Sequence, residues 1–249
     1  MHLLVTRPRP DAAELIDLLQ QAGHRVSYFP LLDIKFYSDV VLPEALPQAI
    51  LITSANGARA LARHRKMSAF ADVLAITVGP ASAKAASEAG FGNIAQTERG
   101  DVIGVIDYVR QHLSPENGLL LYASGTRTTG DLVGELNSDG FEVDRVVLYE
   151  ARAATVLPEE ICQVLKSDSS GKLDGVLLFS PRTAKIWLSL TKGCVLPDEL
   201  AKLRHYCLSE NVANILEQQF CKRGLGKTSD IIICDKPDTP SMLQAVCDA

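Results

Sequence analysis

The amino-acid sequence predicts an α/β protein of two similar lobes, each a parallel sheet flanked by helices. Two observations indicate this architecture. Three kinds of segment occur twice in the same order along the 249 residues. Each segment opens with a short apolar run, passes through a small polar turn and continues with apolar residues at helical spacing. A repeated strand, turn and helix with almost continuously apolar strands is typical of parallel sheets covered on both faces.

The first repeated segment, repeat A, spans residues 3–30 and again residues 121–149. Its first copy has an apolar strand at residues 3–5, followed by apolar residues at helical spacing. Gly23 ends this run and is a good left-handed helix terminator. We therefore expect the helix to stop there and the chain to return to the sheet.

Repeat B covers residues 50–58 and is matched without a gap by residues 176–184, and repeat C covers residues 75–83 and 205–213. The order along the chain is A-B-C-A-B-C. Shorter apolar stretches at residues 94–95 and 231–234 close the two C repeats. They lead into predicted helices at residues 102–112 and 241–246, which makes five parallel strands per lobe the natural count.

Two segments, residues 32–41 and 146–155, lie outside this rhythm and look extended. Both follow a copy of repeat A, so they occupy equivalent positions in the two halves. We interpret them as the strands that cross between the lobes.

The composition excludes several classes of protein. A net charge of −5 and an isoelectric point near 5.6 argue against a nucleic-acid or anionic-membrane partner, because phosphate binding needs clustered Lys and Arg. The N-terminal apolar run is too short for a signal peptide, and no apolar run reaches membrane-spanning length. We expect a soluble cytoplasmic protein.

The six cysteines lie in the second half, and none forms a Cys-x-x-Cys pair. This pattern indicates neither a disulfide framework nor a zinc site, so we expect six reduced thiols. The five histidines are scattered without paired spacing. No metal site and no Ser-His pair is therefore predicted.

Small or hydroxylated residues recur where the predicted strands end. In parallel α/β sheets, ligands bind beyond the carboxyl ends of strands, where helix N-termini present backbone N–H groups. A plain helix N-cap is the alternative for each residue taken alone. The candidate binding residues are Thr6, Arg7, Ser54, Ala55, Asn56, Gly79, Pro80, Ser82, Ser124, Gly125, Thr126, Ser180, Pro181, Arg182, Ser209 and Asn211.

Several such termini facing one cleft would suit a polyanion even in an acidic protein. Each helix N-terminus contributes roughly 0.3–1 kcal/mol per exposed anionic group and up to about 2 kcal/mol when partly buried. Tyr149 ends the second repeat A, at the mouth of a predicted crossover strand. There its phenol would serve as a proton donor, or, as the alternative, lie half-buried with its hydroxyl in water.

At these residues the chain resembles the uroporphyrinogen-III synthase family. The resemblance covers essentially the whole chain and depends on the order and spacing of short motifs. These motifs are Val5-Thr6-Arg7-Pro8, residues 52–58, Val78-Gly79-Pro80 with Ser82-Ala83, Val146-Val147-Leu148-Tyr149, and residues 179–184.

The resemblance implies two flavodoxin-like lobes joined by two extended crossover strands. One lobe would be residues 1–34 with 153–249, the other residues 38–149, and the crossover linkers residues 35–37 and 150–152. The first repeat A would then pack with the second repeats B and C.

The resemblance also implies the chemistry. The substrate would be hydroxymethylbilane, which loses water and closes to uroporphyrinogen III with inversion of its last pyrrole ring. Tyr149 matches the family's cleft tyrosine and would hydrogen-bond the departing hydroxyl. No cofactor or metal is implied, and we expect a monomer that receives its substrate by hand-over from the preceding pathway enzyme.

The chain departs from the family at the second repeat C, where Ser209-Glu210-Asn211 replaces a Gly-Pro turn. Glu210 would place a negative charge near a polyanion, so we expect it to point away from the ligand. Two other classes of protein remain as alternatives. One is a two-lobed solute-binding module for a polyanionic small molecule, and the other is a nucleotide-sugar transferase.

Overall fold

The computed structural model describes residues 1–9, 11–166, 171–222 and 230–248. The chain divides into two compact units. Unit 1 comprises Met1–Asp33 and Arg152–Ala249, and unit 2 comprises Ile34–Ala151. The chain therefore leaves unit 1 once and returns to it once.

Unit 1 contains a five-stranded sheet in the order β11-β10-β9-β1-β2, and all its neighbouring strands are parallel. The central strands are buried along their whole length, which explains their continuous apolar runs. The strands are β1 (His2–Val5), β2 (Arg25–Tyr28), β9 (Gly175–Leu178), β10 (Arg204–Cys207) and β11 (Ile231–Ile233).

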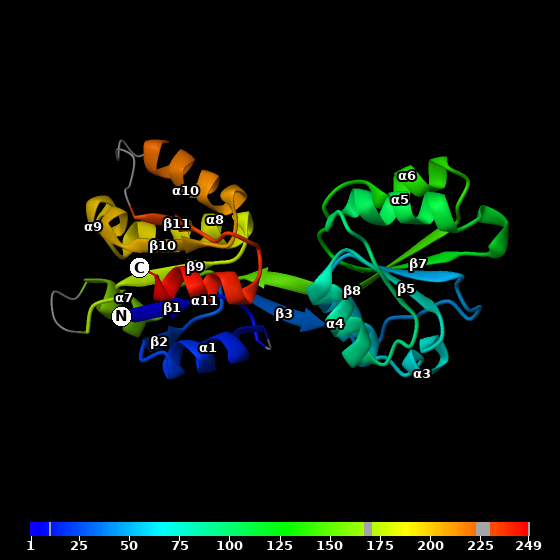
Figure 1. The fold of residues 1–249 in the computed structure, drawn as a ribbon, viewed down its shortest axis with the longest axis horizontal. Coiled ribbons are helices and arrows are strands. Elements are labelled where there is room, and N and C mark those ends of the chain that lie inside the picture. The colour runs from blue at the N-terminus through cyan, green and yellow to red at the C-terminus, as the bar shows by residue number, and fades with distance from the viewer. Residues whose placement is uncertain (10, 167–170, 223–229, 249) are drawn as a thin grey trace. The chain divides into compact units, whose positions relative to one another are not determined.

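Helices cover both faces of this sheet (Figure 1). One apolar cluster joins the sheet to α7, α8, α9 and α10, and another joins its opposite face to α1 and α11. The helices are α1 (Asp11–Gln21), α7 (Glu159–Lys166), α8 (Pro181–Leu190), the 3-10 turn η2 (Thr191–Gly193), α9 (Pro197–Lys202), α10 (Glu210–Lys222) and α11 (Thr239–Cys247).

Unit 2 contains a six-stranded sheet in the order β3-β8-β7-β4-β5-β6. From β7 to β6 and from β7 to β8 the neighbouring strands are parallel. The strands are β3 (Leu32–Phe36), β4 (Ala49–Ile52), β5 (Leu74–Thr77), β6 (Ile94–Gln96), β7 (Leu120–Gly125) and β8 (Val143–Ala153).

The two faces of this second sheet are also covered. The short helices α2, α3 and α4 pack on one face, and α5 and α6 pack on the other. The helices are α2 (Ala55–Ala62), α3 (Met67–Phe70), α4 (Pro80–Ala89), α5 (Val102–His112), the 3-10 turn η1 (Pro115–Asn117) and α6 (Leu132–Ser138).

Each sheet combines repeats from both halves of the sequence. β1 of the first repeat A pairs with β9 of the second repeat B, and β7 of the second repeat A pairs with β4 of the first repeat B. This is the exchange that the family resemblance implied. The two α/β units joined by extended strands agree with the predicted fold class.

The extended segments differ in detail from the expectation. β8 begins at Val143 and its first half is a full strand of the unit 2 sheet, paired with β7. β3 ends at Phe36, before the predicted end at residue 41. The backbone N–H of Tyr37 donates to Leu148 O at 2.9 Å, and that of Ala154 donates to Leu31 O at 3.1 Å. The partner on β8 moves toward the N-terminus as the position on β3 moves toward the C-terminus, so β3 runs antiparallel to β8.

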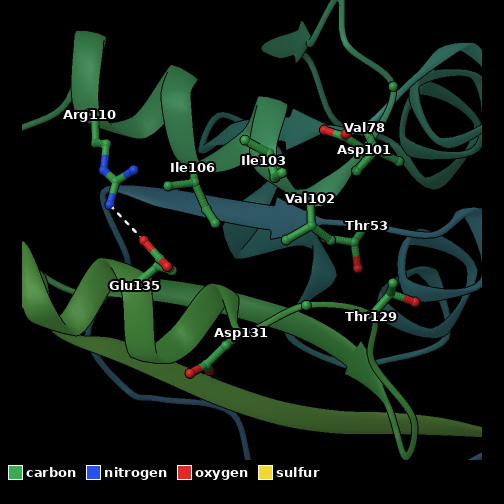
Figure 2. Close-up of a pocket in the computed structure, with 12 residues that line it drawn as sticks. Thr53, Val78, Asp101, Val102, Ile103, Ile106, Arg110, Thr129, Asp131 and Glu135 are labelled. Atoms are coloured by element: carbon green, nitrogen blue, oxygen red, sulfur yellow. Dashed lines mark hydrogen bonds and ion pairs between the residues drawn. The ribbon is translucent and has the colours of Figure 1, made fainter.

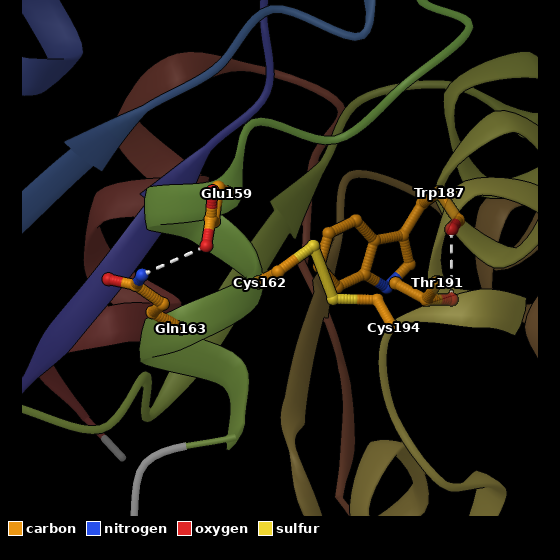
Figure 3. Close-up of a disulfide and its surroundings, with 6 residues drawn as sticks. All are labelled: Glu159, Cys162, Gln163, Trp187, Thr191 and Cys194. Atoms are coloured by element: carbon orange, nitrogen blue, oxygen red, sulfur yellow. Dashed lines mark hydrogen bonds between the residues drawn. A yellow bond between two sulfur atoms is a disulfide. The ribbon is translucent and has the colours of Figure 1, made fainter.

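A disulfide joins Cys162 of α7 to Cys194, which follows η2, beside the indole of Trp187 (Figure 3). The expectation of six reduced thiols is therefore wrong. The two cysteines lie 32 residues apart, so no short spacing pattern reveals them, but the fold brings their Cα atoms to 5.7 Å. That separation lies within the range that a disulfide can bridge.

Candidate active site at the strand ends

Both sheets contain a point where loops diverge from neighbouring strand ends. In unit 2 the chain leaves β7 toward β8 and leaves β4 toward β5, on opposite sides. In unit 1 the chain leaves β1 toward β2 and β9 toward β10 in the same way. Such switch points are where doubly wound sheets bind ligands. Eleven of the sixteen candidate residues lie at the ends of these four strands.

Tyr149 lies on β8, next to the switch point of unit 2, and is 9% exposed. Burial raises the pKa of its phenol above the usual value, while a hydrogen bond with the Ser54 side chain acts in the opposite direction. The nearby Tyr122 raises the pKa further. Tyr149 is thus a neutral, protonated hydroxyl at neutral pH, oriented by the first residue before α2.

The β4–α2 turn is tied to β7 by a second pair of hydroxyls. Thr53 Oγ1 lies 3.0 Å from the Tyr122 hydroxyl, and Tyr122 is almost fully buried in β7. Thr53 and Ser54 therefore hold the turn to the neighbouring strand on one side and to the Tyr149 phenol on the other.

The N-termini of α2 and α4 have no acidic cap. Ser54 caps α2 by accepting a 3.1 Å hydrogen bond from the Asn56 N–H. Gly79 precedes α4 with no side-chain cap, and Pro80 opens that helix. Ser54, Ala55, Asn56 and Gly79 are partly exposed and Pro80 is exposed, whereas Ser82 is buried. These two helix ends are suited to receive an anion.

The end of β7 is more enclosed than its polar sequence indicates. Ser124 and Gly125 are buried, and the Ser124 hydroxyl donates to Val146 O at 3.2 Å. Thr126 is exposed, and its N–H donates to Tyr149 O at 3.0 Å. Ser124 and Gly125 therefore support the strand end, and Thr126 has the exposed side chain.

In unit 1, the Thr6 hydroxyl is fully buried and donates to Leu177 O at 2.6 Å, across β1 and β9. Arg7 follows it and donates to Thr239 Oγ1 at 3.1 Å, with its guanidinium 5.3 Å from the Phe179 ring centroid. Thr6 thus connects the strands, and Arg7 links the end of β1 to α11.

The N-terminus of α8 is fixed by a capping box. Ser180 Oγ accepts from the Thr183 N–H, and Thr183 Oγ1 accepts from the Ser180 N–H. Pro181 is exposed and Arg182 is partly exposed. The box fixes the start of α8, and the first turn of this helix contains no acidic residue.

The turn before α10 differs from the others. Ser209 is partly exposed, and Glu210 and Asn211 are exposed in the first turn of the helix. A carboxylate at this position complements the helix dipole itself. Glu210 therefore occupies the place where an anionic ligand would interact with α10.

A pocket of about 660 Å³ opens in unit 2 beside the same strand ends (Figure 2). Thr53 and Val78, which follow β4 and β5, line it on the sheet side. Apolar side chains of α5 line part of it, and the remaining lining comes from the loops before α5 and α6 and from the two helices themselves. Its other lining residues are Gly100, Asp101, Val102, Ile103, Ile106, Arg110, Thr129, Gly130, Asp131 and Glu135.

The charged groups of this pocket are already engaged. Asp101 accepts from the Gly104 N–H at 2.9 Å, and Asp131 accepts from the Gly134 N–H at 3.0 Å, so each caps its own helix. The pKa of Asp101 is lowered mainly by the hydrogen bond from the Gly104 N–H and, to a smaller extent, by the hydrogen bond from the Arg99 side chain. Arg110 pairs with Glu135 at 2.9 Å. The pocket thus has an acidic balance and suits an uncharged ring better than a carboxylate.

Sequence reasoning missed the pocket residues Asp101, Thr129 and Asp131. Asp101 stands directly before an apolar-periodic helix, which is an N-cap signal visible in the sequence. The pocket itself requires α5 and α6 to lie side by side, and single-helix patterns do not predict that arrangement.

Within the described parts of the chain, no group of three or more His, Cys, Asp or Glu side chains is placed to hold a metal ion. Nor does any helix of that part have the length and apolar character needed to cross a membrane.

Comparison with known proteins gives the family. A family model described as uroporphyrinogen-III synthase HemD matches residues 13–244. No curated protein matches the sequence. The uroporphyrinogen-III synthetase structure from Helicobacter pylori 26695 is 16% identical, with a TM-score of 0.62 over 100% of this chain and 99% of that one.

A mutant uroporphyrinogen III synthase from the extremely thermophilic bacterium Thermus thermophilus is 15% identical, with a TM-score of 0.55 over 100% of both chains. At identities this low, similarity to the two structures establishes the fold alone. The family model, in contrast, matches nearly the whole sequence. The chain belongs to the uroporphyrinogen-III synthase family.

Proposed function

We propose that this chain closes hydroxymethylbilane to uroporphyrinogen III at the strand ends described above, with Tyr149 donating a hydrogen bond to the departing hydroxyl. The family supplies the reaction, a cyclising loss of water with inversion of the last pyrrole ring. The observation that carries the assignment to Tyr149 is its phenol beside the unit 2 switch point, hydrogen-bonded to Ser54.

The raised pKa suits this role. A phenol with its pKa above the usual value keeps its proton at neutral pH, so it donates to a leaving oxygen and does not compete as an anion. General acid catalysis of this kind contributes typically 10²–10⁴-fold. Much of the remaining task is conformational, because the linear substrate must be held in a shape that closes with inversion.

We propose that the substrate carboxylates bind at the helix N-termini that have no acidic cap. These are α2 and α4 in unit 2 and α8 in unit 1. Asp101 and Asp131 would repel a carboxylate, so the neighbouring pocket is assigned to an uncharged pyrrole ring. The binding residues in this proposal are Ser54, Ala55, Asn56, Gly79, Pro80, Thr126, Ser180, Pro181 and Arg182.

We further propose that the protein acts as a cytoplasmic monomer and receives its substrate from the preceding pathway enzyme. Hydroxymethylbilane closes spontaneously without inversion, which favours a short transfer. Sedimentation at micromolar concentration tests the first statement, and the coupled rate of the two enzymes tests the second. A stable dimer would contradict the first, and a coupled rate no faster than that expected from free diffusion would contradict the second.

The deciding experiment supplies purified protein with freshly prepared hydroxymethylbilane and separates the oxidised products by isomer. The proposal expects the type III isomer in excess of a control without enzyme. Type I isomer alone would refute it. The rival function, a two-lobed binding module, has no observation in its favour and would leave the substrate to close as in the control.

A further inference from the structure

The register of β8 against β7 changes beside the proposed catalytic tyrosine. Ser124 lies opposite Val147, but the next residue, Gly125, lies opposite Tyr149. Leu148 is therefore an extra residue on β8. Because side chains alternate along a strand, a register without this extra residue would turn the Tyr149 side chain to the other face. The irregularity decides where the phenol points.

Backbone hydrogen bonds hold the two residues at the register shift, Leu148 and Tyr149, from opposite sides. The Tyr37 N–H donates to Leu148 O at 2.9 Å from β3's side, and the Thr126 N–H donates to Tyr149 O at 3.0 Å from β7's side. Both carbonyls at the register shift therefore have defined partners, and the backbone there has one arrangement.

Arg145 bridges the same register shift with its side chain. Its Nε donates to Ser124 Oγ at 3.1 Å, and its Nη2 donates to Gly125 O at 3.0 Å. These acceptors belong to the two residues between which the register changes. Arg145 itself is exposed, so its packing contributes little to the core, and its specific effect is to fix the end of β7 against β8.

Gly125 makes room for the tyrosine ring. A Cβ atom at this position would lie 2.8 Å from two ring carbons of Tyr149 and 3.1 Å from its hydroxyl oxygen. The ring therefore lies directly against the Gly125 backbone. A displacement of this backbone, whose carbonyl Arg145 holds, would be passed directly to the phenol.

We propose that Arg145 is a positioning residue, which pins the register shift between β7 and β8 and so places the Tyr149 phenol against Gly125. The inference rests on the proposed function in one respect, since it takes Tyr149 as the group that acts on the substrate. It adds a residue directly before the family-like Val-Val-Leu-Tyr segment of β8, outside all the candidate binding residues.

Direct attraction of a substrate carboxylate is the rival role for an exposed cation near a polyanion. Substitution of Arg145 by lysine distinguishes the positioning role from charge attraction. Lysine keeps the charge but cannot reproduce two parallel donors from a planar guanidinium. Pinning therefore predicts that Arg145→Lys and Arg145→Gln behave alike, whereas charge attraction predicts that Arg145→Lys behaves like wild type.

The kinetic test measures kcat and KM for type III isomer formation. We expect both Arg145 variants to lower kcat about tenfold or more, as misplaced catalytic groups do, with KM changed less than about twofold. Lys35→Gln, an exposed cation on β3 of the same sheet, is the matched control for charge. A wild-type kcat in Arg145→Lys, or a KM effect in Arg145→Gln alone, would overturn the inference.

A second readout does not depend on activity. Tyrosine labelled with ¹³C at the ring carbon bearing oxygen gives six signals, and the Tyr149→Phe variant identifies one of them. In Arg145→Lys we expect the Tyr149 signal to shift and the pKa of its phenol to fall, because the phenol meets more water. The Lys35→Gln protein should retain the wild-type signal.

The two measurements separate the inference from the proposed function. A fully active Tyr149→Phe protein would remove Tyr149 from catalysis, and the shifted signal in Arg145→Lys would still establish positioning. An inactive Tyr149→Phe protein combined with an unmoved Tyr149 signal in both Arg145 variants would refute positioning and leave the proposed function intact.

Discussion

The indole N–H of Trp187 donates to Nε2 of His205 at 3.4 Å in the core of unit 1. His205 is completely buried, and the Phe220 ring meets it edge-on with ring centroids 5.5 Å apart. Burial lowers the pKa of His205 from 6.5 to about 4. The imidazole is therefore neutral in the folded protein and able to accept the indole hydrogen bond.

This pair predicts acid sensitivity. Between pH 6.5 and about 4 the unfolded chain binds a proton at His205 that the folded chain does not, so the free energy of unfolding falls as the pH drops through this window. The full effect is about 3 kcal/mol at roughly 1.4 kcal/mol per pKa unit. Urea unfolding from pH 7 to 4 should show a shallower loss for His205→Gln than for wild type. Parallel curves would contradict the pKa assignment.

Tyr149→Phe should lower kcat about 10²-fold, a typical acid–base contribution, and leave residual activity. The ring and its packing on Gly125 are retained, so the unfolding midpoint should move little. Tyr108→Phe on α5 is the matched control, since Tyr108 stacks on His112 away from the strand ends. Equal rates for the Tyr149→Phe and wild-type proteins would remove Tyr149 from the mechanism.

Gly125→Ala should displace the Tyr149 ring, because the new Cβ would approach two ring carbons to 2.8 Å. We expect kcat to fall about 10²-fold and stability to fall by about 1–3 kcal/mol, as for other overpacked sites. The double variant with Tyr149→Phe distinguishes the cause. If displacement of the phenol is the reason, Gly125→Ala will lower kcat far less in the Tyr149→Phe background than in wild type.

Gly57→Ala should loosen α2 from the sheet. A Cβ atom at Gly57 would lie 2.7 Å from Ala123 O of β7, and a backbone oxygen cannot move aside cheaply. We expect a loss of about 1–3 kcal/mol in denaturant unfolding. Gly193→Ala serves as control, because a Cβ atom there meets nothing within 4 Å. An equal change in both variants would mean that loss of glycine, not the contact, is responsible.

The disulfide predicts a defined thiol count. Oxidised protein in denaturant should show the four free cysteines, and reduced protein all six. Opening the bridge, or Cys162→Ser, should cost about 3.7 kcal/mol for a loop of 32 residues, and should change the emission of Trp187, the single tryptophan. Cys221→Ser is the control. Six free thiols without reductant would show that the bridge does not form.

Local pattern was enough to predict the elements with one clear period. The helix at residues 102–112 matches α5 at both ends, because Asp101 caps it and its apolar face is continuous. The repeated strands could be predicted because each is a continuous apolar run. The exchange of β1 and β7 between the sheets required the family resemblance, since two similar halves give no preference for either pairing.

The site was less accessible from the sequence. Thr6 and Ser124 were predicted to bind the ligand because they are polar residues at strand ends. Both hydroxyls are in fact buried and donate hydrogen bonds to carbonyl groups of neighbouring strands. Whether a hydroxyl faces a ligand or a carbonyl depends on packing between elements. The register shift at Leu148 and the disulfide partner of Cys162 are likewise set by contacts between distant segments, which no local pattern records.

The strand exchange has a consequence for synthesis on the ribosome. β1 is made long before its partner on β9, because Gly175 follows Leu3 by 172 positions. At about 5–20 residues per second, the nascent chain waits roughly 10–35 s before this pairing becomes available. Unit 2, being one continuous stretch, is translated in full during that interval. β1 can pair early with β2, but it lacks its other neighbour β9 until unit 2 has been made, and during that interval this side of the strand needs shelter from aggregation.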